Sequence, residues 1–419
     1  MSLNRKAMVL AVGAALAAPS AYSQQASDKW EIYGKFYPEM THDGSSGATA
    51  AGAGGSTLSI SPTGVNGLVH RWEMQISNTY LGFRGSRNLG GGLRAIGQLE
   101  QTVNIDEGNA SGNATSTTSF ANRDSFAGLE TGWGTVRLGN MDTPFKKYGD
   151  TLGFLGVSSG NFVTANNVSR KIGVGTSSAS SFNLRRANSI DYASPTIPGG
   201  VQVALQYSIG SPTETGIVPT GRFPRVVSLG VKWEQGPLYL AAAGEMHYDL
   251  FGGSNAVNIA GAGVTATRND NNPDAHSKDG AVQLTAVFKI GDHSIEADVN
   301  TKQYRESGGA AATSFQQYKN TAAVLIWEAR WTSQWRTALS YVRATAGSCS
   351  LVNQDCSTSG LQGSLIAAGL TYSFDPSTYL FGLASRLTNG TSARFNDSPQ
   401  TPNPGEDINQ VAVGIAYSF

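Results

Sequence analysis

Residues 410–419, Gln410-Val411-Ala412-Val413-Gly414-Ile415-Ala416-Tyr417-Ser418-Phe419, alternate strictly in polarity. Every odd-numbered position is apolar or aromatic, and every even-numbered position is small or polar. Successive side chains of a β-strand point to opposite faces, so this pattern predicts a strand with one apolar and one wettable face. A slip of one residue would exchange the two faces, so the register of this strand is strongly specified.

The same alternation recurs along the chain. It is clearest in residues 201–208, 227–234, 295–300 and 365–374. A soluble β-sandwich also alternates, so the period alone does not identify the architecture. Aromatic residues at the predicted strand ends, including Trp233, Trp327 and Phe374, favour a membrane-spanning barrel, in which such residues form girdles at the two interfaces.

Short and long connections alternate between the predicted strands. The short ones are 88–92, 132–134, 195–200, 235–237, 291–293, 332–335 and 375–377, and the long ones include 41–70, 249–279 and 389–407. Short turns at one rim and long loops at the other are typical of bacterial barrels. Counting the strands between these connections predicts an all-β fold, a sixteen-stranded antiparallel transmembrane β-barrel.

Composition agrees with this interpretation. The 419 residues include 51 Gly, and only 14% are charged, whereas soluble globular proteins carry about 25%. After the N-terminus there is no run of some eighteen apolar residues, so the sequence predicts no transmembrane helix. A closed barrel is the other structure that satisfies all its backbone groups in lipid.

The N-terminus predicts export. Arg5 and Lys6 precede an apolar stretch at 7–18 and a small-x-small processing site at 21–23, which together resemble a secretory signal peptide. We therefore expect residues 1–23 to be removed and residues 24–419 to form a single barrel domain. Without Arg5 and Lys6 the formal charge of +0 becomes close to −2, and this balance does not point to nucleic acid.

Several motifs together resemble the Gram-negative general porins, most of all their β-proteobacterial branch. Residues 79–86 and 89–100 resemble the second and third strands of that family, and 123–129 with 132–140 its fourth and fifth. Residues 30–40 match its first strand, and Phe419 its last residue. The resemblance implies an outer-membrane homotrimer around water-filled pores, in contact with outer-membrane lipid, including lipopolysaccharide.

The resemblance also implies that the third loop folds inward and narrows the pore. Here that loop is 141–186, and it is lengthened by a Ser/Gly/Asn-rich stretch at 158–181. By formal count it carries six basic side chains against Asp142 and Asp150.

The phase of the strands predicts which side chains line the lumen. On the first strand Ile32 and Phe36 point outward, which leaves Lys35 inside. The same reasoning places four further charged residues in the pore, Arg84, Arg94, Glu100 and Arg137, and Asp142 is expected beside it as part of the third loop. Lys35 and the three arginines could form one basic wall that enriches anions. The alternative is that the basic residues cap strand ends or pair with acids, which leaves neutral or cation preference open.

Other features have simpler interpretations. Cys349 and Cys356 lie in one predicted outer loop of an exported chain, so we expect a local disulfide. The five histidines show no metal-ligand spacing, and neither a metal nor another cofactor is expected. The predicted function is passive diffusion of small hydrophilic solutes and ions, leaning toward anions. The alternatives are a substrate-specific channel with an internal binding site and, less favoured, an outer-membrane barrel enzyme.

Overall fold

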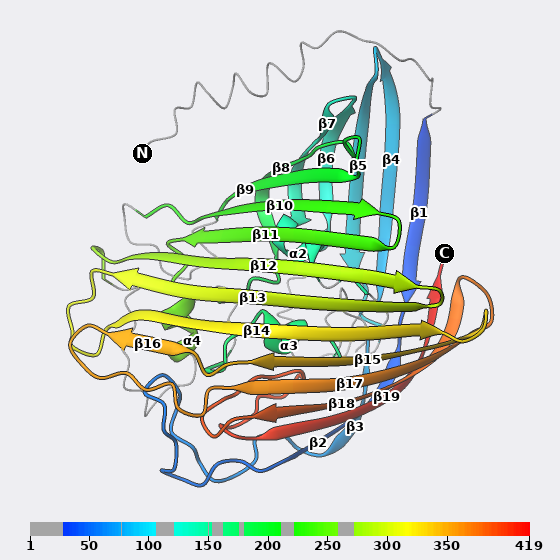
Figure 1. Ribbon diagram of the computed structural model, residues 1–419. Helices are drawn as coiled ribbons and strands as arrows, with labels where there is room; N and C mark the ends of the chain where they lie inside the picture. The colour runs from blue at the N-terminus through cyan, green and yellow to red at the C-terminus, as the bar shows by residue number, and fades with distance from the viewer. Residues whose placement is uncertain are drawn as a thin grey trace.

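The strands of the chain close into one antiparallel sheet (Figure 1). The computed structural model describes residues 28–76, 78–105, 121–149, 151–152, 162–175, 180–210, 222–258 and 272–419. The predicted signal peptide, 1–23, lies outside these residues. The strands are β1 (Lys29–Phe36), β2 (Glu39–Ser46), β3 (Arg71–Gln75), β4 (Tyr80–Gly90), β5 (Leu93–Thr102), β6 (Ser125–Thr131), β7 (Gly134–Asp142), β8 (Arg185–Ala193), β9 (Val201–Ile209), β10 (Arg225–Gln235), β11 (Leu238–Tyr248), β12 (His276–Ile290), β13 (His293–Ser307), β14 (Phe315–Arg330), β15 (Trp335–Ala344), β16 (Ser348–Leu351), β17 (Gly363–Ser373), β18 (Thr378–Asn389) and β19 (Asp407–Ser418).

Three pairs of these strands are single wall segments with a short interruption. They are β1 with β2, β3 with β4, and β15 with β16, and each pair lies between the same neighbouring wall segments. The described chain therefore crosses the wall sixteen times, and β1 pairs with β19 to close the barrel. The predicted sixteen-stranded antiparallel barrel is confirmed.

The first wall segment differs from its prediction in length. The sequence placed a loop from residue 41, whereas β2 continues the ladder to Ser46. Pro38 separates β1 from β2, because proline has no N–H to donate to a sheet. Its carbonyl still accepts a hydrogen bond from the Ile415 amide at 3.3 Å, so the wall stays closed at the break.

The C-terminal strand has the predicted phase. Val411, Val413, Ile415, Tyr417 and Phe419 are 41–63% exposed on the outer face, whereas Ala412 and Ala416 are buried inside. Phe419 closes the barrel by exchanging two backbone hydrogen bonds with Gly34, each 3.1 Å long. Its ring also packs 5.8 Å from that of Phe36.

The two rims differ as predicted. Turns such as 236–237 and 291–292 join neighbouring strands at one rim, on the right of Figure 1, beside the C-terminus. Gly236 and Gly291 have φ of +58° and +57°, which tight two-residue hairpin turns require and only glycine adopts without strain. The long connections gather at the opposite rim, where α4 (Gly252–Asn258) lies.

One long connection enters the barrel instead of covering its rim. Between β7 and β8 the chain forms α2 (Pro144–Tyr148) and α3 (Asn166–Ser169), which lie behind the front wall in Figure 1. Phe162 and Val163 of this loop pack in one buried cluster with Tyr37 and Phe381 of the wall. The predicted inward-folded third loop is confirmed. None of the helices in the described residues is long and apolar enough to cross a membrane.

Candidate channel and its constriction

The register of the sheet fixes which side chains share the inner face. Ile32 lies opposite Phe83, which lies opposite Leu99, and all three are exposed on the outside. The residues between them therefore point inward. Glu31 lies opposite Arg84 and Lys35 opposite Tyr80, each pair on this inner face.

The same reasoning applies further round the wall. Arg137 lies opposite Asp191, and Asp191 lies opposite Gln206. The Gln206 amide donates to the Met141 carbonyl at the start of the third loop, so this row faces the interior. Arg94 lies on the inner face beside the short turn, opposite Asn88 and Glu130. Lys35, Arg84, Arg94 and Arg137 thus share one inner wall.

Each arginine of that wall is paired with a carboxylate. Arg84 contacts Glu31 at 2.8 Å and Arg94 contacts Glu130 at 2.5 Å. Arg137 binds Asp191, a residue whose side chain is only 1% exposed. Arg123, which the sequence did not single out, binds Glu100. The wall therefore presents rows of ion pairs and not a bare positive surface.

Sequence reasoning missed Arg123, Glu130 and Asp191. No local signal sets Glu130 opposite Arg94, because the long connection 103–124 joins β5 to β6 and only the closed sheet fixes their register. Arg123 lies before β6 begins, where alternation no longer applies. Asp191 is recognised as the partner of Arg137 only when the register between β7 and β8, the strand after the third loop, is known.

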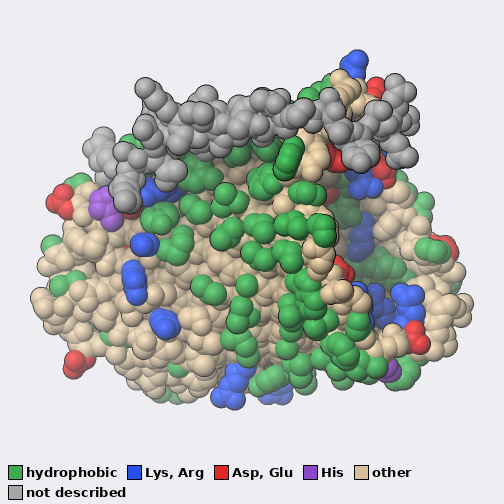
Figure 2. All heavy atoms as spheres, turned by 45° about the horizontal axis from the view of Figure 1, so that its top comes forward, with side chains coloured by type: hydrophobic (Ala, Val, Ile, Leu, Met, Phe, Trp, Pro, Cys, Tyr) green, Lys and Arg blue, Asp and Glu red, His purple; other side chains and the backbone are tan. Residues whose placement is uncertain are grey.

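Water reaches this wall. The side chains of Arg84 and Glu31 are 52% and 53% exposed although they point into the barrel, so open space lies in front of them. Figure 2 shows a hollow beside the apolar outer surface, with Lys/Arg and Asp/Glu side chains close together inside it. The third loop therefore does not fill the interior.

The entrance of the third loop is locally determined. Thr143 caps α2 by accepting from the Lys146 amide, and Pro144 begins the helix, where proline costs no hydrogen bond. Phe145 is buried, and its amide donates to the Ser228 hydroxyl at 3.0 Å. Lys146 binds Asp142 at 2.7 Å.

The remainder of the loop is fastened to distant parts of the wall. Glu296 of β13 accepts from the amides of Thr151 at 2.8 Å and Leu152 at 2.7 Å. Lys302 of β13 donates to the Ser169 carbonyl. On the neighbouring strand β12, Gln283 accepts from Arg170 at 3.1 Å.

The predicted charges of the loop mostly hold it in place. Arg185 binds Asp124 at 2.7 Å and Asp142 at 3.3 Å, and Arg170 is almost fully buried. Asp150 lies outside the described residues. Within the described residues, the excess of basic side chains in this loop is used largely in contacts with the barrel and does not form an open positive lining.

Lys171 joins the third loop to the outer loop 390–406. Its ammonium donates to the Asn167 side chain at 2.8 Å and to the Asn396 carbonyl at 3.1 Å. The neighbouring carboxylate of Asp397 is buried, although other atoms of the residue are partly accessible. Burial raises the pKa of Asp397 to about 8, against the attraction of Lys171, and burial lowers the pKa of Lys171 to about 8.

This pair predicts a minimum of stability near pH 8. Because the folded pKa of Asp397 lies above its ordinary value, stability falls as pH rises from about 4 to about 8. Because the folded pKa of Lys171 lies below its ordinary value, stability recovers between about 8 and 10. Urea-unfolding midpoints measured from pH 4 to pH 10 should show this minimum. In the variant Asp397→Asn the loss of stability between about pH 4 and pH 8 should disappear. Asp292→Asn, in a short turn, is the control and should keep the wild-type profile. An unchanged pH profile in Asp397→Asn would contradict the assignment of this loss to Asp397.

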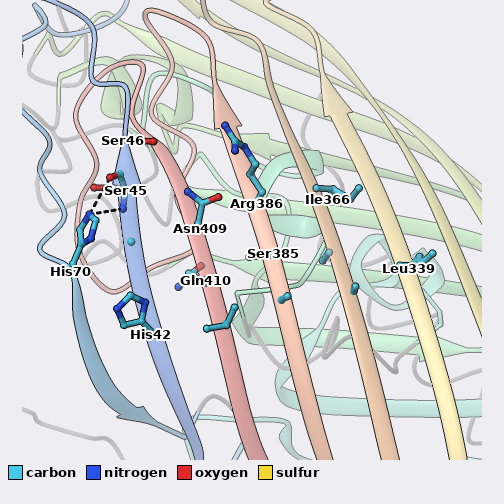
Figure 3. A pocket seen from close by; sticks show the side chains of 15 residues that line it. His42, Ser45, Ser46, His70, Leu339, Ile366, Ser385, Arg386, Asn409 and Gln410 are labelled. Carbon is cyan, nitrogen blue, oxygen red and sulfur yellow. Dashed lines mark hydrogen bonds between the residues drawn. The ribbon is translucent and has the colours of Figure 1, made fainter.

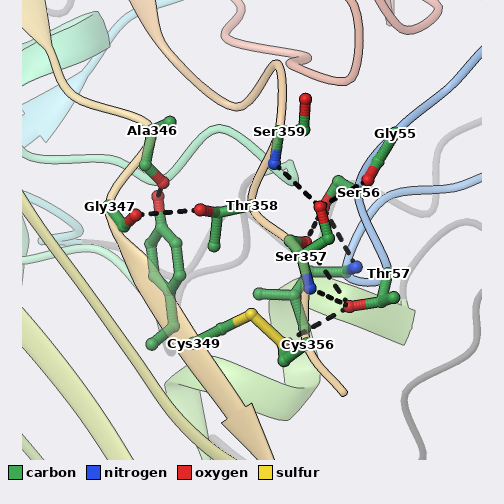
Figure 4. The surroundings of a disulfide bond; sticks show 12 residues. Gly55, Ser56, Thr57, Ala346, Gly347, Cys349, Cys356, Ser357, Thr358 and Ser359 are labelled. Carbon is green, nitrogen blue, oxygen red and sulfur yellow. Dashed lines mark hydrogen bonds between the residues drawn. A yellow bond between two sulfur atoms is a disulfide. The ribbon is translucent and has the colours of Figure 1, made fainter.

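The two cysteines form a disulfide at the long-loop rim (Figure 4). The Thr57 hydroxyl donates to the Cys356 sulfur at 3.3 Å, and the Ser357 amide donates to Thr57 at 3.1 Å. The disulfide thus ties the chain after β16 back to β16 itself, and the Thr57 hydrogen bonds attach that segment to the loop that follows β2.

The barrel is closed and apolar outside, its charged interior is open to solvent, and one loop folds into it. These features define a transmembrane β-barrel of the outer-membrane channel class. The chain belongs to the Gram-negative porin family, which matches residues 7–323. Members of this family are outer-membrane proteins, and this is the location of the chain.

Curated relatives match a limited part of the chain. Major outer membrane protein P.IA of Neisseria meningitidis is 37% identical over 97 residues, which is 23% of each chain. Major outer membrane protein P.IB of Neisseria lactamica is 40% identical over 72 residues, 17% of this chain and 19% of that protein. The matched segment thus spans less than a quarter of the length of these relatives.

Solved structures share the whole fold at low identity. An anion-selective porin from Comamonas acidovorans has a TM-score of 0.64 at 18% identity, over 94% of this chain and all of that chain. In-vitro folded OmpT of Vibrio cholerae has a TM-score of 0.59 at 14% identity, over 96% of this chain and all of that chain. These likenesses concern the fold.

Proposed function

We propose that this protein is a water-filled channel for passive diffusion of small hydrophilic solutes and ions across the outer membrane, with a preference for anions. The observation that carries the proposal is the half-exposed pair Arg84 and Glu31 on the inner face, which requires open space inside a barrel that a fastened loop narrows. The fold and the relatives are those of channels, which speaks against the alternative of an enzyme.

The preference for anions rests on the basic side chains of the inner wall. Their ion pairs reduce the net field, but guanidinium groups such as that of Arg84 keep N–H groups at the water-filled side. Lys35 adds a cation that lies over aromatic rings. The structurally similar porin from Comamonas acidovorans is itself anion-selective, which supports the same preference here.

Planar-bilayer recording tests the channel. We expect the purified protein to give stepwise increases in current that are proportional to voltage, a conductance that rises with salt, and a reversal potential in a salt gradient that favours anions. Solute-dependent saturation or block would support the substrate-specific alternative. Heat-modifiability on gels shows whether the barrel is folded. Folded protein that gives no conductance would refute the proposal.

We propose further that the chain assembles as a homotrimer through the outer face around β1 and β19. Ile32, Phe36 and Phe419 are exposed there by 61%, 38% and 46% and are the candidate contacts. The similar OmpT of Vibrio cholerae has been solved in a trimer form. Light scattering in mild detergent should give three copies per particle, and a monomer at working concentration would contradict this.

Outer-membrane lipid, including lipopolysaccharide, is the proposed partner of the exterior. A groove of about 730 Å³ crosses the outer face of β2, β15 and β17–β19, with Leu339 and Ile366 beside its apolar part (Figure 3). Arg386, which also pairs with Asp407 at 3.1 Å, lies near the long-loop rim, where an anionic headgroup would meet it. Arg386→Ser should lower the amount of lipopolysaccharide that copurifies with the protein, and unchanged lipid would contradict this role.

A further inference from the structure

The inner wall carries tyrosine rings and cations in alternation. This aromatic–basic strip consists of Tyr33, Lys35, Tyr37, Tyr80, Arg84 and Arg123. Its members come from β1, from the residue that follows β1, from β4 and from the segment before β6. The strip therefore depends on the closed sheet and not on one local motif.

Each cation of the strip contacts a ring. The Arg84 guanidinium lies 4.7 Å from the centre of the Tyr33 ring, and that of Arg123 lies 4.7 Å from the Tyr80 ring. The Lys35 ammonium lies 4.6 Å from the Tyr37 ring. The Tyr33 and Tyr80 rings meet edge to face at 6.2 Å, which joins these contacts into one continuous surface.

Two features hold the Tyr33 ring in one orientation. Its hydroxyl donates to Glu100 at 2.9 Å. Gly82 of the neighbouring strand leaves room for the ring, since a Cβ atom at that position would lie 2.3 Å from the Tyr33 Cζ atom. A ring fixed in this way offers a π face at little cost in conformational entropy.

The strip leads from open water to the constriction. Arg84 is half exposed, whereas Tyr37, at the other end, is buried beside Phe162 of the third loop. Successive inward residues Tyr33, Lys35 and Tyr37 span roughly 13 Å along β1, at about 3.3 Å for each residue. A solute that passes the strip therefore meets rings and cations up to the narrowed part of the barrel.

We propose that this strip is a binding track for aryl carboxylates, solutes that combine an aromatic ring with an anionic carboxylate. The carboxylate accepts hydrogen bonds from Arg84 or Lys35, and the ring packs against Tyr33 or Tyr80 or stacks on a guanidinium plane. A carboxylate of similar size without a π system makes the first contact and loses the second. The inference rests on the proposed channel and, within it, favours the substrate-specific alternative, because it gives the lumen a binding site for one class of solute.

The test compares benzoate with cyclohexanecarboxylate, two monoanions of similar size that differ in the π system. Each is titrated as a blocker of the KCl current through the whole protein in planar bilayers. We expect the half-blocking concentration of benzoate to be roughly three- to tenfold lower, the effect of one or two aromatic or cation–π contacts.

Variants then locate the effect. Tyr33→Leu/Tyr80→Leu should abolish the preference for benzoate, whereas Tyr33→Phe/Tyr80→Phe, which keeps the rings and removes the hydroxyl groups, should retain it. Tyr248→Leu is the matched control, because that ring lies 4.2 Å from Arg225 but alternates with the inward His247 and so faces outward. It should retain the preference as well.

The outcomes separate the track from the channel. If the protein conducts KCl but is blocked equally by both solutes, the track is refuted and the channel stands. The same holds if the leucine variant keeps the wild-type preference. Folded protein that conducts no KCl overturns both.

Discussion

Replacing Arg84 with Ser shifts the reversal potential in a salt gradient toward cations, and Arg84→Ser/Arg137→Ser shifts it further. Removal of Arg84 leaves the half-exposed Glu31 without its partner at 2.8 Å, so the net charge of the wall falls by one unit. The double variant lowers it by two units, and charges of this size near a pore change the energy difference between anion and cation by about 1–2 kcal/mol, or about tenfold in the permeability ratio. The experiment is best made at about 0.1 M salt, where the Debye length is about 10 Å, and the shift should shrink near 1 M.

Charge-balanced variants show whether net charge is the cause. Glu31→Ser/Arg84→Ser removes both members of a pair and should change selectivity little. Arg84→Ser alone is the safer single variant, because Arg137 neutralises the buried Asp191 and its loss destabilises the wall. Wild-type selectivity of the double arginine variant at low salt would show that this wall is not the filter and would direct attention to the third loop.

Glu296→Ala/Lys302→Met releases the third loop and raises the single-channel conductance, with fluctuations between levels. Glu296 is fully buried and binds the amides of Thr151 and Leu152, and Lys302 is equally buried against Ser169. A hydrogen bond to a charged group contributes about 1.5–3 kcal/mol, so the combined loss of these contacts is enough to move a local loop equilibrium by about a hundredfold or more.

The conservative variant Glu296→Gln keeps an acceptor for the Thr151 and Leu152 amides and should conserve most of the narrow state. Heat-modifiability on gels checks that the barrel itself still folds. Conductance that stays at the wild-type level in a folded Glu296→Ala/Lys302→Met protein would show that these contacts do not hold the constriction.

Sequence alone determined the barrel and its two faces. The alternation at 410–419 and the short turns at 236–237 and 291–292 are local, because neighbouring residues on a strand must point to opposite sides wherever the strand lies. For the same reason the sequence alone predicts that Ile32 points outward and that Lys35 and Arg84, which alternate with apolar residues, point inward.

Only the tertiary structure decided how the interior is arranged. Glu296 binds Thr151 across 145 residues of sequence, and Asp191 meets Arg137 across 54, distances over which alternation says nothing about which side chains meet. The basic wall expected from single strands became rows of ion pairs once the register set acids opposite arginines. A charge in low dielectric must find a partner or lose its ionisation, and which partner it finds depends on the closure of the whole sheet.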